Sequence, residues 1–302
     1  AEVVVHLEPA GAGAEFDLRD VGLALQVEPF GPGARDLLAL LVEGRPEAGA
    51  DIALFEIVPE RAEETATRIR ELGRRALPIV GDVMDADALR AGIAAADAEF
   101  GRLDILVNNA GGTAARPFLE QSERSWRRHI DINLVSMLAA THAAAPVMIR
   151  EGRGGAILNI ASIEAERAAP NFAVYAACKA GMASFTKSMA VELSGHGIRV
   201  NCLAPDHTVT PGNQGNRSGP VDPSTWRQRS EDEVDAMNRL IPLGREGIDQ
   251  ECGDAAVFLC SSLASYVTGV VLPVDGGTWA AGGWVRGRNG KWTLNEGLSF
   301  GG

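Results

Sequence analysis

The middle of the chain alternates short apolar runs, typical of β-strands, with longer stretches in which apolar residues recur at helical spacing. The predicted strands cover residues 51–57, 76–80, 105–108, 156–160, 199–204 and 269–273. The predicted helices cover residues 60–72, 86–100, 122–148, 174–193 and 250–261. Apolar strands that alternate with amphipathic helices predict an α/β fold, a doubly wound parallel sheet covered on both faces. Such sheets bind ligands beyond the carboxyl ends of their strands.

Two segments depart from this alternation. Residues 205–233 are rich in glycine, proline, asparagine and serine and are long for a connection, so we predict that residues 206–240 form a substrate lid. Residues 278–302 form a tail that contains three of the five tryptophans and either packs on its own domain or reaches a neighbouring subunit. Residues 1–20 are predicted to lead into one domain that spans residues 21–277.

Charge and composition exclude several classes of partner. The chain of 302 residues has 28 basic and 40 acidic side chains, a net charge of −12, which disfavours nucleic acid and anionic membranes. We find no run of about 18 apolar residues and no basic start typical of a signal peptide, so we expect a cytoplasmic protein. The four cysteines lack the close spacing of zinc or redox sites, which predicts buried thiols and no metal.

Three residues carry the strongest chemical signal. Tyr175 and Lys179 lie four positions apart on a helical pattern and therefore share one face, while Ser162 follows the strand at 156–160. A free tyrosine has a pKa of about 10, and a cation one turn away stabilises the phenolate and lowers that pKa. A serine hydroxyl can then hold a substrate oxygen while Tyr175 transfers a proton.

Two asparagine-containing positions add to this signal. The sequence Asn108-Asn109-Ala110-Gly111 follows an apolar strand, and it is either a plain turn or a place where a flat ligand approaches the backbone closely. Asn133 lies inside the predicted helix 122–148, although asparagine is a mediocre helix former. Its side chain either bonds a backbone carbonyl and opens a kink, or holds a water for proton relay.

These motifs resemble the short-chain dehydrogenase/reductase family, in particular its 3-oxoacyl-thioester reductases and secondary-alcohol dehydrogenases. The residues that carry the resemblance are Asn108-Asn109-Ala110-Gly111, Asn133, Ser162 and Tyr175-x-x-x-Lys179. Further matching landmarks are Asp82-Val83, Asn201-x-x-Ala204-Pro205, Thr210 and Val274-Asp275-Gly276-Gly277. The similarity runs from about residue 48 to residue 277.

The resemblance implies a single Rossmann-like domain that transfers hydride between NAD(P) and an alcohol or carbonyl carbon. It implies that Tyr175 is the acid/base and that Lys179 lowers its pKa and binds the nicotinamide ribose. Ser162 would orient the substrate oxygen, and Asn133 would anchor a proton-relay water. Family members are usually tetramers or dimers that pack the helices containing Asn133 and Tyr175, so we expect a homo-oligomer.

The resemblance also implies where the cofactor lies. Asp82 and Val83 would hold the adenine, and Asn109, followed by Ala110 and Gly111, would lie along the cofactor. Thr210, after Pro205, would meet the carboxamide of the nicotinamide.

The cofactor preference can be inferred from the end of the predicted strand 51–57. Glu56 can accept hydrogen bonds from both ribose hydroxyls and would repel a 2′-phosphate. The next residue is Ile57, with no arginine there to hold that phosphate. The sequence therefore favours NAD over NADP.

The phosphate-binding loop is atypical. Gly31 and Gly33, after an apolar run at 22–27, supply two of the three glycines expected between the first strand and helix, and Glu28 places a carboxylate near the phosphates. An alternative, Gly11-x-Gly13, leaves too long a segment before the next strand.

Three interpretations of residues 21–47 remain. They form a divergent but working site, they have lost dinucleotide binding, or they are not correctly represented in this sequence. The retention of Asp82, Asn109, Tyr175 and Lys179 argues against the second. A smaller departure is Asp206, where glycine commonly follows the proline.

We therefore predict an NAD-dependent oxidoreductase that interconverts a small-molecule secondary alcohol and a ketone, with Tyr175 as acid/base. One alternative is a lyase or isomerase that uses Tyr175 without net hydride exchange. Another is a catalytically silent binding protein, which the atypical glycine loop favours.

Overall fold

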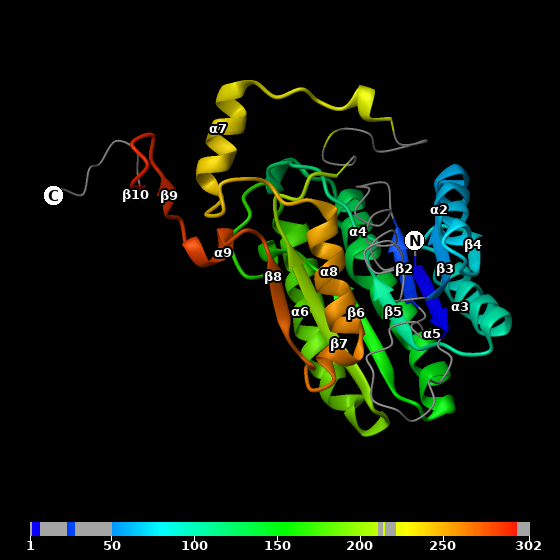
Figure 1. Ribbon diagram of the computed structural model, residues 1–302. Helices are drawn as coiled ribbons and strands as arrows, with labels where there is room; N and C mark the ends of the chain where they lie inside the picture. Colours follow the sequence, from blue (N-terminus) through cyan, green and yellow to red (C-terminus); the bar gives the residue numbers. More distant parts are fainter. Residues whose placement is uncertain (1, 7–22, 28–49, 211–213, 215–221, 295–302) are drawn as a thin grey trace.

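The computed structural model describes residues 2–6, 23–27, 50–210, 214 and 222–294. A single sheet with helices on both faces forms the body of the molecule (Figure 1). Its parallel strands lie in the order β4-β3-β2-β5-β6-β7-β8. The bounds are β2 (Leu23–Val27), β3 (Asp51–Glu56), β4 (Ala76–Val80), β5 (Ile105–Asn108), β6 (Gly155–Ile160), β7 (Ile198–Pro205) and β8 (Val271–Val274). The doubly wound parallel sheet predicted from the sequence is confirmed.

The strand order places a switch point between β2 and β5. The chain runs from β2 through β3 to β4 in one direction and from β5 to β8 in the other, so the crossovers diverge there. Open α/β sheets bind ligands in the crevice at such a point. Asn109 directly follows β5 and therefore lies at this crevice.

The first residues of the chain contribute to the sheet as well. The strand β1 (Glu2–His6) pairs antiparallel with β3 and β5, so part of the predicted lead-in, residues 1–20, belongs to the sheet. The run predicted at 22–27 forms β2, parallel to β3 and β5. Both glycine motifs, Gly11-x-Gly13 and Gly31-x-Gly33, lie outside the described residues.

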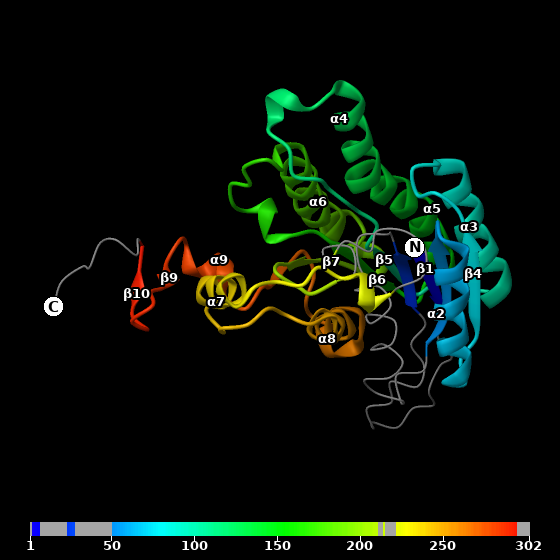
Figure 2. The same ribbon diagram turned by 90° about the horizontal axis from the view of Figure 1, so that it is seen from above.

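The helices cover both faces of the sheet, as Figure 2 shows from above. On one face lie α3 (Ala86–Phe100), α5 (Ser136–Glu151) and α6 (Ala173–Glu192), and on the other lie α2 (Pro59–Glu71) and α8 (Asp249–Cys260). Every residue of β3 and β5 is buried, as expected for central strands covered on both sides. The predicted strand 269–273 begins only at Val271, because Gly269 has a φ of 77°, outside the strand region.

One long helical run carries Asn133. It consists of α4 (Glu123–Ile130), a π-helical turn (Asp131–Val135) and α5, in agreement with the predicted helix 122–148. Across the described residues, one run, Glu123–Arg150, is long and apolar enough to cross a bilayer by length and composition. The sequence analysis looked only for a run of about 18 apolar residues, and this criterion missed the helix. Its side chains Met137, Ala140 and Ala144 are at most 1% exposed, so this helix packs into the core.

The described residues of the predicted lid and of the tail lie at the edge of the body. Within residues 206–240 the structure describes a short 3-10 helix (Pro223–Thr225) and α7 (Glu231–Leu240). The tail forms α9 (Thr278–Ala281), β9 (Val285–Arg286) and β10 (Trp292–Thr293), and it stands away from the sheet beside α7 (Figure 1). Arg239 of α7 donates a hydrogen bond to the carbonyl of Arg286 at 3.4 Å. The described part of the tail therefore packs against α7 of the same chain.

Candidate active site

The helix α6 places Tyr175 and Lys179 beside the carboxyl end of β6. Lys179 is 3% exposed, and its Nζ donates a hydrogen bond of 2.7 Å to the carbonyl of Ile160. The same Nζ lies 5.7 Å from the centre of the Tyr175 ring. The Ser162 side chain forms a hydrogen bond with the phenol of Tyr175. The three residues that carried the sequence prediction thus form one cluster.

A buried polar network fixes α6 against the strands. Asn108 at the end of β5 donates to Asn159 of β6 at 2.8 Å, and Asn159 donates to Thr186 of α6, also at 2.8 Å. Asn108 also donates to Thr141 of α5 at 3.1 Å. Because all four side chains are at most 2% exposed, these bonds have no competing water and set the position of α6. The sequence analysis did not identify this network.

Asn133 holds the loop that follows β5. Its Nδ2 donates to the carbonyl of Gly112 at 2.8 Å, and its Oδ1 accepts from the Gly112 amide at 2.9 Å. The same Nδ2 donates to the carbonyl of His129 in α4 at 3.0 Å, and Asn133 itself lies in the π-helical turn. The bond to a backbone carbonyl is therefore observed, whereas the kink and the proton-relay water stay predictions.

Gly111 tolerates no side chain in this arrangement. A Cβ built there would lie 2.7 Å from Oδ1 of Asn133 and 3.1 Å from Nζ of Lys179. The side chains of Asn133 and Lys179 therefore approach the backbone of Gly111 closely, and Gly111 lines the cleft; the approach of a flat ligand stays a prediction.

A cleft of about 500 Å³ lies at this end of the sheet. It brings together seven of the predicted residues: Asn109, Gly111, Ser162, Tyr175, Lys179, Pro205 and Thr210. Asn133 is fully buried behind the cleft, and Ala110 is 1% exposed. Residues from the loops after β5, β6 and β7 and from α6 therefore meet at one place.

Burial dominates the ionisation of the central pair. It raises the pKa of Tyr175 to about 12; the hydrogen bond from Ser162 lowers that pKa and the charges of Glu164 and Asp206 raise it further. Burial lowers the pKa of Lys179 to about 8. The net shift of the Tyr175 pKa is therefore upward, and a lowering of that pKa by the charge of Lys179 stays a prediction. At neutral pH the phenol is protonated and can donate a proton.

The residues predicted to hold the adenosine lie apart from this cleft. Glu56 ends β3 and Asp82 follows β4, its neighbour in the sheet; Glu56 is 1% exposed and Val83 is 3% exposed. Oε1 of Glu56 accepts a hydrogen bond from the Val58 amide at 2.8 Å, while Oε2 is buried with no hydrogen-bond partner among the described residues. A buried carboxylate oxygen without a donor fits a ribose hydroxyl.

An arginine that sequence reasoning missed lies near this carboxylate. Arg61 of α2 is 4% exposed; burial lowers the pKa of its guanidinium, and the charge of Glu56 raises it. The sequence analysis considered only the residue next to Glu56, Ile57, and did not identify Arg61. Gly31 and Gly33, the predicted phosphate loop, lie outside the described residues.

Two further titratable residues, Asp206 and His207, line the cleft, and Glu164 and Arg167 connect to it through Asp206. Glu164 and Arg167 follow Ser162, and Asp206 and His207 follow β7. Arg167 forms hydrogen bonds with both carboxylates. In the sequence, these residues are marked only by their position after strand ends. The ion pair between Arg167 and Asp206, which are 39 residues apart, could not be predicted from it.

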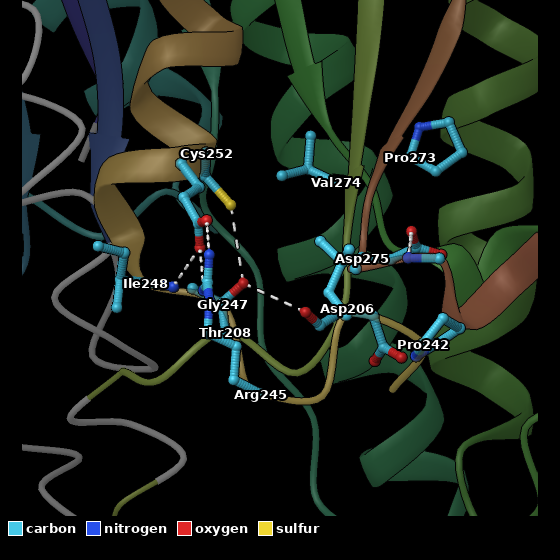
Figure 3. Close-up of a pocket in the computed structure, with 14 residues that line it drawn as sticks. Asp206, Thr208, Pro242, Arg245, Gly247, Ile248, Cys252, Pro273, Val274 and Asp275 are labelled. Atoms are coloured by element: carbon cyan, nitrogen blue, oxygen red, sulfur yellow. Dashed lines mark hydrogen bonds and ion pairs between the residues drawn. The ribbon is translucent and has the colours of Figure 1, made fainter. Parts of the chain in front are cut away.

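A second pocket, of about 440 Å³, lies behind the segment 206–208 (Figure 3). The hydroxyl of Thr208 donates to the Asp206 carbonyl at 3.3 Å and lies 3.7 Å from the sulfur of Cys252. Burial raises the pKa of Cys252 to about 11. Cys178, Cys202 and Cys260 are buried, and burial raises the pKa of each thiol, as expected for unreactive cysteines.

The sequence model described as Enoyl-(Acyl carrier protein) reductase matches residues 43–278. The chain belongs to the short-chain dehydrogenase/reductase family. It is 37% identical over 238 residues to 2-dehydro-3-deoxy-D-gluconate 5-dehydrogenase of Escherichia coli (strain K12), covering 79% of this chain and 88% of that protein. It is 38% identical over 226 residues to 3beta-hydroxysteroid dehydrogenase 1 of Eggerthella lenta, covering 75% and 82%.

Solved structures of the family superpose on most of this short-chain dehydrogenase/reductase. Carveol dehydrogenase from Mycobacterium avium in complex with NAD has a TM-score of 0.75 and 30% identity, covering 86% of this chain and 97% of that one. Acetoin dehydrogenase from Enterobacter cloacae has a TM-score of 0.72 and 33% identity, covering 86% and 95%. The family assignment establishes an oxidoreductase of CH–OH or keto groups, and the NAD complex supports a nicotinamide cofactor.

Proposed function

We propose that this short-chain dehydrogenase/reductase uses NAD to interconvert a secondary alcohol and a ketone, with Tyr175 as the acid/base. The observation that carries the proposal is the single cleft lined by Ser162, Tyr175 and Lys179 opposite the backbone of Gly111. A nicotinamide dinucleotide, when bound, supplies or accepts the hydride. Gly111 and Asn109 would lie along it, and Thr210 would meet its carboxamide.

The residues of the chain then move and hold the proton. The Ser162 hydroxyl, which forms a hydrogen bond with the phenol, would orient the carbonyl oxygen of the substrate toward Tyr175. Because the phenol is protonated, it would donate its proton to that oxygen during reduction. The buried ammonium of Lys179 would stabilise the phenolate that remains.

The direct test is an assay of ketone reduction. We expect the purified protein to bind NADH in calorimetry and to oxidise it when small ketones are added. Binding of NADH without oxidation by any ketone or reduction of NAD by any alcohol would favour the lyase or isomerase alternative. Absence of binding would favour the catalytically silent alternative.

The preference for NAD is expected to depend on Glu56. In Glu56→Gln, Oε1 can still accept from the Val58 amide, but the charge that would repel a 2′-phosphate is gone and Arg61 remains nearby. We expect the ratio of NADH to NADPH affinity to fall about tenfold, a change of about 1.4 kcal/mol. Glu63→Gln removes an exposed carboxylate of α2, the helix that carries Arg61, and serves as the control. An unchanged ratio in Glu56→Gln would contradict the role of Glu56.

The oligomer and the compartment stay predictions. The helical run with Asn133 exposes the apolar side chains of Ile130, Val135 and Leu138, at 38%, 41% and 36%. Such a stripe supports the packing of this helix against a second copy. We propose a cytoplasmic dimer or tetramer that acts on small molecules.

A further inference from the structure

An ionic cluster links the two loops that border the reacting side of the cleft. The Arg167 guanidinium donates to Oε1 of Glu164 at 2.8 Å and to Oδ2 of Asp206 at 3.1 Å. Glu164 lies two residues after Ser162 on the loop that follows β6, whereas Asp206 directly follows β7. Both carboxylates act electrostatically on the phenol of Tyr175. The cluster therefore sets the charge that a substrate meets beside the acid/base.

The cluster carries an excess of negative charge. Two carboxylates share one guanidinium; burial by itself lowers the Arg167 pKa, but the bonds and charges of Glu164 and Asp206 raise it above its ordinary value. Nε2 of His207 lies 3.0 Å from Oδ2 of Asp206 without forming a hydrogen bond, and it adds a positive charge only when protonated. With a neutral His207, the two carboxylates and the Arg167 guanidinium together carry one net negative charge.

Of the three residues joined by these ion pairs, Glu164, Arg167 and Asp206, Asp206 lines the cleft. Of the described residues that line it, those that ionise besides Tyr175 are Lys179, Asp206 and His207. Lys179 is 3% exposed and points to the Ile160 carbonyl, so it offers little charge to a substrate. The Asp206 side chain is 12% exposed. A carboxylate in this place accepts hydrogen bonds and repels another carboxylate.

We propose that Asp206 is a specificity-determining residue that selects neutral ketones and secondary alcohols bearing a hydrogen-bond donor, such as a second hydroxyl or an amide, and disfavours substrates that carry a carboxylate. This inference rests on the proposed function, because it concerns the same cleft. The sequence supports it independently, since glycine, which commonly follows the proline in this family, offers neither charge nor acceptor at residue 206.

The test uses two ketones with the same number of heavy atoms, acetoacetamide and acetoacetate, which differ in charge and in the amide donor. We would measure kcat/KM with NADH at pH 8. We would also measure the affinity of each ketone for the protein with NADH present, by calorimetry. This second readout reports on Asp206 even without turnover, so failure of the oxidoreductase function is distinguished from failure of this inference.

We expect the wild-type protein to favour acetoacetamide at least tenfold in both readouts. Asp206→Asn and Asp206→Gly should reduce this preference about tenfold, chiefly by improving acetoacetate, and Asp206→Glu should retain it. Asp87→Asn, which removes one negative charge at a side chain 90% exposed on α3, should leave the preference unchanged. Equal preference in the wild type, a preference that survives in Asp206→Asn, or no binding of acetoacetamide would each overturn the inference.

Discussion

Replacing Tyr175 by phenylalanine should reduce kcat for ketone reduction about 10³-fold and leave the affinity for NADH within twofold. The phenol of Tyr175 lines the cleft, is protonated at neutral pH and forms a hydrogen bond with Ser162, and phenylalanine keeps the ring while removing the proton. The lost hydrogen bond should lower the free energy of unfolding by only about 1 kcal/mol. Steady-state rates, calorimetry with NADH and thermal unfolding test these three statements.

The chain supplies its own control for this exchange. Its second tyrosine, Tyr266, is fully exposed, so Tyr266→Phe changes the same chemical group far from any buried contact. We expect Tyr266→Phe to keep the wild-type kcat. Substantial turnover in Tyr175→Phe would show that another group transfers the proton, and equal losses in both variants would point to a general structural effect.

The sequence predicted the parts of the fold that depend on local patterns. The strands β3 to β7 and the helices α2, α3, α6 and α8 lie within a few residues of their predicted bounds, because a parallel sheet requires apolar runs and amphipathic helices. The spacing of Tyr175 and Lys179 likewise fixes their common helix face. For Asn133 the sequence left two alternatives open, and the structure shows the bonds of its side chain to backbone groups of Gly112 and His129.

The features that sequence reasoning missed depend on tertiary contacts. The Lys179 ammonium donates to the Ile160 carbonyl, 19 residues away, and burial raises the Tyr175 pKa, which is the direction opposite to the one predicted. The bond between Arg167 and Asp206 also joins residues that only the folded sheet brings together. Helical spacing cannot predict either contact, because it fixes which residues share a helix face but not which residues pack against that face.

The second large effect is expected at Lys179 and depends on pH. Burial lowers the pKa of this ammonium to about 8, so its charge is present below pH 8 and is lost as the pH rises above that value. If the charge stabilises the phenolate that Tyr175 leaves after donating its proton, kcat/KM for ketone reduction should be constant from pH 6 to 7 and fall above about pH 8. Lys179→Met should lower the rate at pH 7 by about 10²-fold and abolish this decline.

The same burial predicts that Lys179→Met still folds. The charged form is disfavoured inside the protein, so a methionine of similar length removes a desolvated charge and leaves only the Ile160 carbonyl without its donor. We expect the thermal midpoint to change by roughly 4 °C or less. Lys187→Met, on the exposed face of the same helix, should retain both the wild-type rate and the wild-type pH profile. A wild-type rate that stays constant up to pH 10, or a Lys179→Met variant with the wild-type profile, would show that the ammonium takes no part in proton transfer.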